Sequence, residues 1–583
     1  MPPSRGESER VIPKLVANYI PRVIVKFRDN DNREMPPAER ARIQQDEIKR
    51  YESIERNPER YLGASWIRLV EQHRGLTIQK LITSVTPQQI IKLREKARRS
   101  DRTYRPANFL TYFAVRCPSA EIAQKVAKTL RNHDLWPSVA GAYVEGGPAL
   151  PPGVALSTGE AAMQGHLDPS PSNGGSPGGI DAKYAWRISG GDGGGSQVGL
   201  QFVDLECGWV LDHQDLPTGL RQIPLPISGK NILEKGHGTG TLGIVVAVEN
   251  NARECVGITP HVETTKVVSP WVTSNQGQTW TYSVANAIMA ALNILHPGDV
   301  LLLEVQTKTP SQYTPRSPGF GYPVEVEEVE FNAIKDAKAL NIIVIEAAGN
   351  AGGDLDPLLF STWTTTPFFS LNPLNPNFQD SGAIMVGSAL SIPGSARSRR
   401  NNYGTRIDCY AWDNSIWTTG YDDGAPVPAT LTNPSSDPKK SYFGLSGTSG
   451  ASAIIAGAAL AIQGIAQKHR KGGLANGRFS PNRLRAIFHN PATGTLSEYS
   501  TWNKNLNSTW DPNNPHFSTW NADKIGTMPD LKKIIKKTLR IHPVHMVKIK
   551  KKRIKKPKRP TGPGPKKQVL RKKPAKAKRK SPK

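Results

Sequence analysis

GLSGTSGASAIIAGAALAI, residues 444–462, contains no charged side chain and repeats Gly, Ala and Ser among its apolar residues. A helix of this composition has no polar face to turn toward water, so the pattern predicts a helix buried on all sides. Ser449 follows Gly447 and Thr448 at the start of the stretch, where Ser commonly caps a helix. The amide groups and dipole at a helix start also favour developing negative charge. The stretch predicts a large core and makes Ser449 a candidate nucleophile.

Short apolar runs of strand length lie N-terminal to this helix. They cover residues 198–203, 300–303, 341–345 and 382–386, and helical patterns at 284–295 and 326–340 lie between some of them. Near-continuous apolar strands separated by helices are typical of a parallel sheet covered on both faces. We therefore predict an α/β fold with a doubly wound, mostly parallel sheet in a domain of residues 180–539.

The region before this domain has a different pattern. Residues 1–145 alternate short strands with charged helices and predict a small α+β domain. Its predicted strands are 22–27, 110–115 and 141–145, and its predicted helices are 86–99 and 119–133. Residues 146–179 are rich in Gly, Pro and Ser, which predicts a flexible linker or a processing region.

The net charge of +27 is concentrated at the C-terminus. Residues 548–583 contain 19 Lys and Arg and no Asp or Glu, which leaves +8 for the rest of the chain. We predict that residues 540–583 form a disordered basic tail. Such a tail can bind nucleic acid or another polyanion by releasing counterions, although a solvated tail that aids solubility explains it equally well.

Cysteine use and hydropathy favour a cytoplasmic protein. The four cysteines are far apart and predict free thiols in a reducing compartment. The N-terminus lacks the apolar stretch of a secretory signal. We find no continuous apolar segment that predicts a membrane span, so no membrane partner is expected.

Three further residues complete a set suited to acyl transfer. Asp204 ends the apolar run 198–203, and His237 stands between small residues that let a helix start close to neighbouring backbone. Asn350 follows the run 341–345, directly after Gly349. Each residue alone is more often structural. Together with Ser449 they supply a nucleophile, a base, an orienting carboxylate and an amide donor for an oxyanion.

This order of motifs resembles the subtilisin-like serine peptidase family, the subtilases or peptidase family S8. The matching motifs are H-G-T around His237, A-A-G-N ending at Asn350 and G-T-S ending at Ser449. The resemblance implies that Asp204, His237 and Ser449 are catalytic and that Asn350 is the oxyanion donor. It also implies a seven-stranded, mostly parallel sheet and endopeptidase activity on protein or peptide substrates bound as an added strand. The first domain then resembles the family's propeptide, which assists folding and inhibits the enzyme; the alternative is a permanent accessory domain.

The sequence departs from the family pattern at three places. Ala453 replaces a Pro, and the usual Asp-Thr/Ser-Gly reads Asp204-Leu205-Glu206, which adds a carboxylate near the triad. The strand expected to hold substrate contains Glu304 instead of the usual small residues. Glu304 and Gly349 are the candidate substrate-binding residues. A carboxylate lining a subsite favours basic side chains, but Glu304 can equally point away from the cleft.

No metal or cofactor is predicted to be required. The acidic loop Asp354-Leu-Asp356 lacks the spaced ligands of a calcium site, so calcium is possible but unsupported. A serine-carboxyl peptidase is disfavoured because that class has Glu and Asp where this chain has His237 and Asn350. The alternative function is a non-catalytic polyanion-binding protein that keeps the subtilase scaffold.

Overall fold

The computed structural model describes most of the chain outside its linkers and ends. The described residues are 19–29, 35–149, 164–169, 178–224, 235–249, 255–273, 280–308, 321–360, 369–391, 397, 400–420, 437–497 and 525–542. They lie in one compact unit, Met1–Pro543. The predicted tail of residues 540–583 lies outside the described residues except at 540–542. Ile541 is buried there and its amide donates to the Ile535 carbonyl at 3.1 Å, so the folded part extends slightly beyond the predicted boundary.

A large sheet forms the centre of the second domain, and its strand order is β21-β22-β18-β17-β14-β11-β6-β8-β7. All neighbouring pairs are parallel except β21 and β22. The strands are β6 (Gln201–Leu205), β7 (Arg221–Gln222), β8 (Thr264–Val268), β11 (Val300–Leu303), β14 (Ile343–Ala347), β17 (Ile384–Ala389), β18 (Cys409–Trp412), β21 (Gly494–Leu496) and β22 (Thr527–Pro529). Over the described residues the sheet therefore has nine strands instead of the expected seven, because the short β7 and β21 extend its edges.

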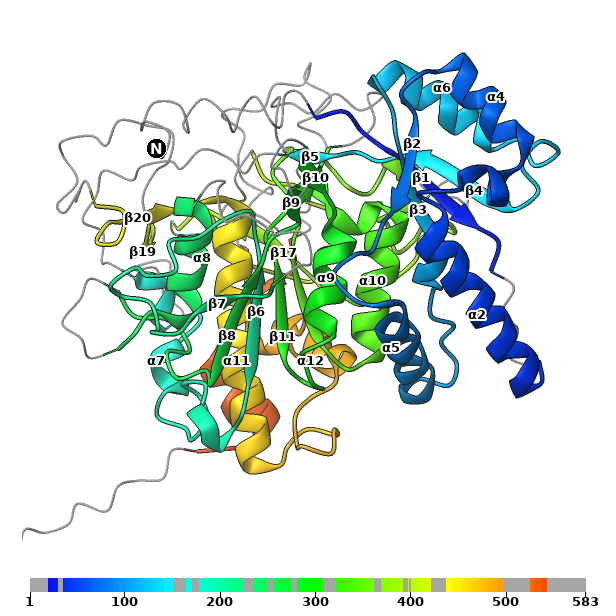
Figure 1. Cartoon of the computed structure of the whole chain (residues 1–583). Helices are drawn as coiled ribbons and strands as arrows, with labels where there is room; N and C mark the ends of the chain where they lie inside the picture. Colours follow the sequence, from blue (N-terminus) through cyan, green and yellow to red (C-terminus); the bar gives the residue numbers. More distant parts are fainter. Residues whose placement is uncertain are drawn as a thin grey trace, which may run out of the picture. The chain divides into compact units, whose positions relative to one another are not determined.

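Helices cover both faces of this sheet (Figure 1). Alternate residues of β11 show the two layers. Val300 and Leu302 belong to the hydrophobic cluster that contains α11 (Gly447–His469) and α8 (Lys235–Val246). Leu301 and Leu303 belong to the cluster with α9 (Val284–Leu292) and α10 (Glu328–Ala339). The predicted doubly wound, mostly parallel architecture is confirmed.

Helix α11 is the buried helix that the charge-free stretch predicted. Its residues from Gly447 to Ala466 are all buried. Small residues allow this, since a Cβ on Gly457 would lie 2.7 Å from Ile258 and one on Gly464 would lie 2.1 Å from the Gly190 carbonyl oxygen. The helix is long and apolar enough to cross a membrane by length and composition, but its apolar window is wholly buried inside the fold.

The N-terminal domain is a four-stranded antiparallel sheet with helices. Its strand order is β2-β3-β1-β4, and Ser119 caps the last helix. The strands are β1 (Val23–Phe27), β2 (Thr77–Lys80), β3 (Tyr112–Arg116) and β4 (Val139–Val144), and the helices are α2 (Pro37–Ser53), α3 (Pro58–Leu62), α4 (Ala64–Gln72), α5 (Pro87–Ser100) and α6 (Ala120–Leu130). The sequence predicted all of these strands except β2.

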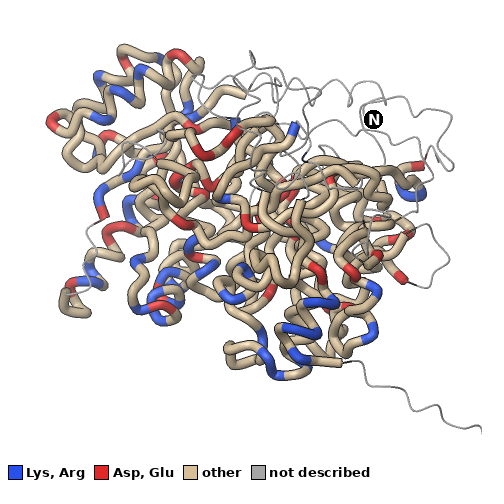
Figure 2. The backbone as a smooth tube through the Cα atoms, turned by 180° about the vertical axis from the view of Figure 1, so that it is seen from behind, with Lys and Arg blue, Asp and Glu red and all other residues tan. Residues whose placement is uncertain are grey.

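This domain packs against α9 and α10 through polar contacts and a shared hydrophobic cluster. Lys26 pairs with Glu328 at 2.9 Å, and the Tyr104 hydroxyl donates to Asp336 at 2.6 Å. Asn286 Oδ1 accepts from the amides of residues 83 and 84 at 2.7 and 2.8 Å. Figure 2 shows several Asp and Glu positions in the middle of the fold and many Lys and Arg positions near its margins. All four cysteines are described, and none forms a disulfide.

Candidate active site

The carboxyl end of β6 places two acidic side chains on one face of the sheet. Asp204 is the penultimate strand residue and Glu206 follows the strand directly. Residues two apart in extended backbone point the same way, and Phe202 on this face packs in the cluster that contains α8 and α11. Both carboxylates therefore face the first turns of α8, which carries His237.

Glu206 is the carboxylate that bonds His237. Its Oε2 lies 2.7 Å from His237 Nδ1, and its Oε1 accepts the amide of Cys207. Glu206 and His237 are 1% and 6% exposed, so little water competes with the bond. The structure thus places Glu206, and not the predicted Asp204, against His237 Nδ1.

Asp204 lies deeper and has other partners. Trp209 Nε1 donates to Asp204 Oδ2 at 2.7 Å, and the Thr241 hydroxyl lies 3.2 Å from the same oxygen. Thr241 is one helical turn beyond His237 on α8. Burial, followed by the nearby charge of Glu206, raises the pKa of Asp204 to about 7. Asp204 therefore fixes the start of α8 to the end of β6.

The sequence did not distinguish the two carboxylates because both end the same strand. The deciding contact involves Gly238, where an added Cβ would lie 2.2 Å from the Gly208 carbonyl oxygen and 2.8 Å from Glu206 Cγ. The predicted close approach of small residues around His237 is thus present. This close approach brings the turn after β6 against α8. The Glu206 side chain, which is longer than that of Asp204, then reaches His237.

Ser449 and Asn350 meet at the first turn of α11. Thr448, the residue before Ser449, donates from its amide and its hydroxyl to Asn350 Oδ1, both at 3.1 Å. These bonds use the carbonyl end of the Asn350 side chain and leave its Nδ2 as a donor. Ser449 is 1% exposed, and its Oγ has no hydrogen-bond partner among the described residues.

Gln306, which no sequence motif pointed to, holds Asn350 from the other side. Gln306 Oε1 accepts the Asn350 amide at 2.9 Å and lies 3.3 Å from Asn350 Nδ2. Gln306 lies on β12 (Gln306–Thr307), which continues from the end of β11. The only sequence signal was that Gln306 replaces a small residue of the family pattern.

The two candidate substrate-binding residues are both enclosed. The Glu304 carboxyl is 2% exposed and contacts Ser452 on α11 at 2.7 Å. Gly349 has a φ of +89°, and a Cβ there would lie 2.5 Å from the Gly321 carbonyl oxygen. Glycine is therefore needed for the turn that presents Asn350.

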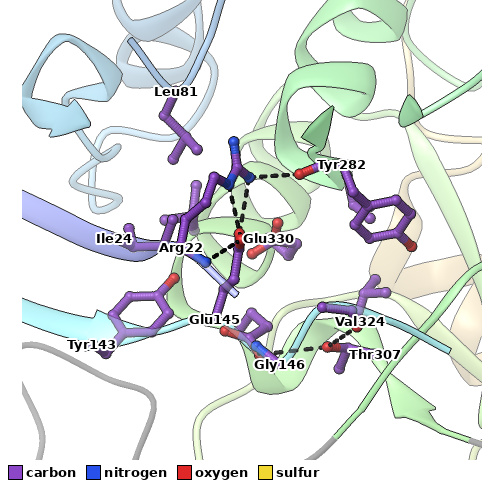
Figure 3. Close-up of a pocket in the computed structure, with 14 residues that line it drawn as sticks. Arg22, Ile24, Leu81, Tyr143, Glu145, Gly146, Tyr282, Thr307, Val324 and Glu330 are labelled. Carbon is purple, nitrogen blue, oxygen red and sulfur yellow. Dashed lines mark hydrogen bonds and ion pairs between the residues drawn. The ribbon is translucent and has the colours of Figure 1, made fainter. Parts of the chain in front are cut away.

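The segment leaving the N-terminal domain adds a strand beside β12. β5 (Pro148–Ala149) pairs antiparallel with β12, and the Lys308 amide donates to the Gly147 carbonyl at 3.1 Å. A small cavity of about 20 Å³ lies beside this crossing. Figure 3 shows the Arg22–Glu145 ion pair among the residues that line it. Arg22 also donates to the carbonyl oxygen of Tyr282, and this contact joins the two domains.

The charged residues of the site do not form a metal centre. Among the described residues, no group of three or more His, Cys, Asp or Glu side chains has the arrangement needed to hold a metal ion. The described arrangement instead offers a hydroxyl at a helix start, an imidazole bonded to a carboxylate, and an amide donor. These are the parts of acyl transfer through a serine.

Parts of the chain are similar to known proteins. Residues 230–513, which include His237, Asn350 and Ser449, match the model of the subtilase family. The fold is similar to the epidermin leader peptide processing serine protease of Staphylococcus aureus (13% identity, 89% of this chain and 99% of that chain, TM-score 0.44). It is also similar to fervidolysin of Fervidobacterium pennivorans (13% identity, 90% and 62%, TM-score 0.46) and to the prenylagaramide maturation protease PagA (14% identity, 61% and 97%, TM-score 0.37). A search of curated proteins found no match.

Proposed function

This chain belongs to the subtilase family of serine endopeptidases, and we propose that it cleaves peptide bonds with a Ser449–His237–Glu206 triad. The 2.7 Å bond between His237 Nδ1 and Glu206 Oε2 carries this assignment, because the triad carboxylate must contact that nitrogen. In this proposal Asp204, on β6, supports α8 through its contact with Thr241.

The proposed reaction follows acyl transfer. His237 Nε2 takes the proton of Ser449 as its Oγ attacks the substrate carbonyl carbon, and Glu206 stabilises the imidazolium. Asn350 Nδ2 and the amides at the start of α11 stabilise the oxyanion. His237 then protonates the leaving amine, and water releases the acyl group by the reverse proton path.

The test is loss of activity without loss of fold. We expect the chain to hydrolyse a denatured protein, to be labelled on Ser449 by a fluorophosphonate, and to lose both properties in Ser449→Ala. Hydrolysis by Ser449→Ala at the wild-type rate would exclude Ser449 as the nucleophile. Circular dichroism of both proteins checks that the variant is folded.

We also propose that the N-terminal domain is an inhibitory propeptide. The supporting observation is that β5 pairs antiparallel with β12, as an added strand does. In this register Pro148 lies opposite Thr307 and Ala149 opposite Gln306. A peptide continuing in the same direction passes Val305 and then Glu304, which contacts Ser452 three residues beyond Ser449. The strand thus leads toward the nucleophile.

Intact-mass measurement tests the propeptide proposal. We expect wild-type protein to shorten with time by loss of its N-terminal domain and Ser449→Ala to keep its full mass. The released domain should inhibit the remaining enzyme when added back. Equal full-length masses in an active wild type and in Ser449→Ala would show that the domain is a permanent part of the enzyme.

A further inference from the structure

Glu304 joins the end of β11 to the start of the nucleophile helix, 148 residues further along the chain. It follows β11 directly, and its amide donates to the Leu205 carbonyl at 3.1 Å. Its side chain lies on the α11 face of the sheet, the face of Asp204 and Glu206. Glu304 Oε1 lies 2.7 Å from the Ser452 hydroxyl, whereas Oε2 is buried without a hydrogen-bond partner among the described residues.

Ser452 connects this carboxyl group to the catalytic turn. Its Oγ lies 2.8 Å from the Thr448 carbonyl oxygen and 3.0 Å from that of Ser449. A hydroxyl has one proton, and carbonyl oxygens only accept. When Ser452 donates to one of these carbonyls, the proton in its contact with Glu304 must come from Glu304. The two contacts are satisfied together only if Glu304 is protonated.

Burial and two nearby carboxyl groups favour the same state. Asp204 and Glu206 face it from the end of β6, and His237 faces it from α8. Neighbouring β14 contributes the carboxyl of Glu346, but Glu346 lies on the opposite face, where it accepts the amide of Glu325 at 3.0 Å. Burial is the main cause that raises the pKa of Glu304 well above its usual range. His237 and the Ser452 hydrogen bond oppose this rise, and Asp204 and Glu206 add to it.

We propose that protonated Glu304 is a positioning residue that holds the Thr448–Ser449 turn through Ser452, and that its ionisation lowers activity at alkaline pH. Ionised Glu304 takes the Ser452 proton for itself, so the turn loses this contact. It also adds a negative charge at a buried position that contacts Ser452, three residues beyond the proposed nucleophile. The proposal rests on the proposed function, since it concerns the pH range in which Ser449 works.

The test is the pH dependence of kcat and KM in wild type, Glu304→Gln, Ser452→Ala and the double variant. We expect wild-type kcat to rise as His237 loses its proton and to fall again in alkali. Gln donates a hydrogen bond at every pH, so Glu304→Gln should keep neutral activity within about threefold and lose the alkaline fall. Ser452→Ala should lower kcat about tenfold, and Glu304→Gln should add little to it.

Three outcomes overturn the proposal. They are an unchanged alkaline fall in Glu304→Gln, loss of its neutral activity, and a rise of KM confined to substrates with Lys or Arg before the scissile bond. The last result would make Glu304 a subsite residue. Glu346→Gln, a buried carboxyl on the other face, is the matched control and should keep the wild-type profile.

An infrared difference spectrum tests the proton independently of activity. The full-length Ser449→Ala chain minus its Glu304→Gln derivative should show the stretching band of a protonated carboxyl at pH 7. Absence of this band would overturn the inference. A wild type that is inert and unlabelled at every pH would instead overturn the proposed function, and the band would still report on Glu304.

Discussion

The two faces of the central sheet use buried carboxyl groups for different purposes. On the face covered by α8 and α11, Glu206 bonds an imidazole and Glu304 contacts a hydroxyl within the same domain. On the face covered by α9 and α10, Glu328 and Asp336 pair with Lys26 and Tyr104 of the N-terminal domain. In the proposed function, the first arrangement orients groups that react. The second holds a domain whose contacts must break if it is to leave.

The largest expected effect on activity comes from substituting Glu206, the carboxylate that bonds His237. Glu206→Gln should lower kcat about 10⁴-fold, because the amide neither fixes the imidazole tautomer nor stabilises its positive charge. The measurement is hydrolysis of a denatured protein together with the rate at which a fluorophosphonate labels Ser449.

Asp204→Asn is the matched control, since it changes a neighbouring buried carboxylate by the same chemistry. Its oxygen can still accept from Trp209, so the loss should stay within about tenfold. A loss of about 10⁴-fold in Asp204→Asn with a small effect in Glu206→Gln would return the triad to the assignment based on the sequence.

On the face covered by α8 and α11, the sequence predicts features that depend on neighbouring residues in the chain. It does not predict contacts between residues far apart in the chain. Helix α11 was predictable because a long charge-free stretch can only be buried, and its start identified Ser449. Which of Asp204 and Glu206 contacts His237 was not predictable. It depends on how closely Gly238 approaches the backbone of Gly208, which is a tertiary contact. The contact of Glu304 with Ser452 joins residues far apart in sequence, and no local pattern reports it.

Asn350 should give the next largest effect on the catalytic face. Asn350→Ala removes the Nδ2 donor and should lower kcat about 10²- to 10³-fold, with little change in KM. A change in KM alone would mean that Asn350 holds substrate and does not act on the oxyanion. Steady-state kinetics on a single peptide substrate separate the two.

The elements of the fold show the same division between local and distant causes. Strands β1, β3 and β4 were predicted because each is a clear apolar run between polar segments. Strand β2 and the sheet-edge strands β7 and β21 were not, since two to four residues carry too little periodic signal. These short strands exist because a neighbouring strand offers them backbone hydrogen bonds.

The smallest expected effect concerns the face covered by α9 and α10. It is the pH dependence with which the N-terminal domain docks there. Burial against the N-terminal domain raises the pKa of Asp336 to about 7. Docked Asp336 therefore keeps a proton that the undocked residue loses at its ordinary, lower pKa, so docking weakens as pH rises between these two values and levels off above the higher one. Between pH 6 and 8 this residue should increase the opening equilibrium about tenfold.

Amide hydrogen exchange in full-length Ser449→Ala measures this opening, with protection factors in α5 and α10 corrected for the intrinsic pH dependence of exchange. Adding Asp336→Asn, which is neutral at every pH, should remove that tenfold share while Tyr104 keeps an acceptor. Equal pH dependence with and without Asp336→Asn would place the titrating groups elsewhere on α10. The contact of Tyr104 with Asp336 would then still hold the domain, but it would not set the pH dependence of docking.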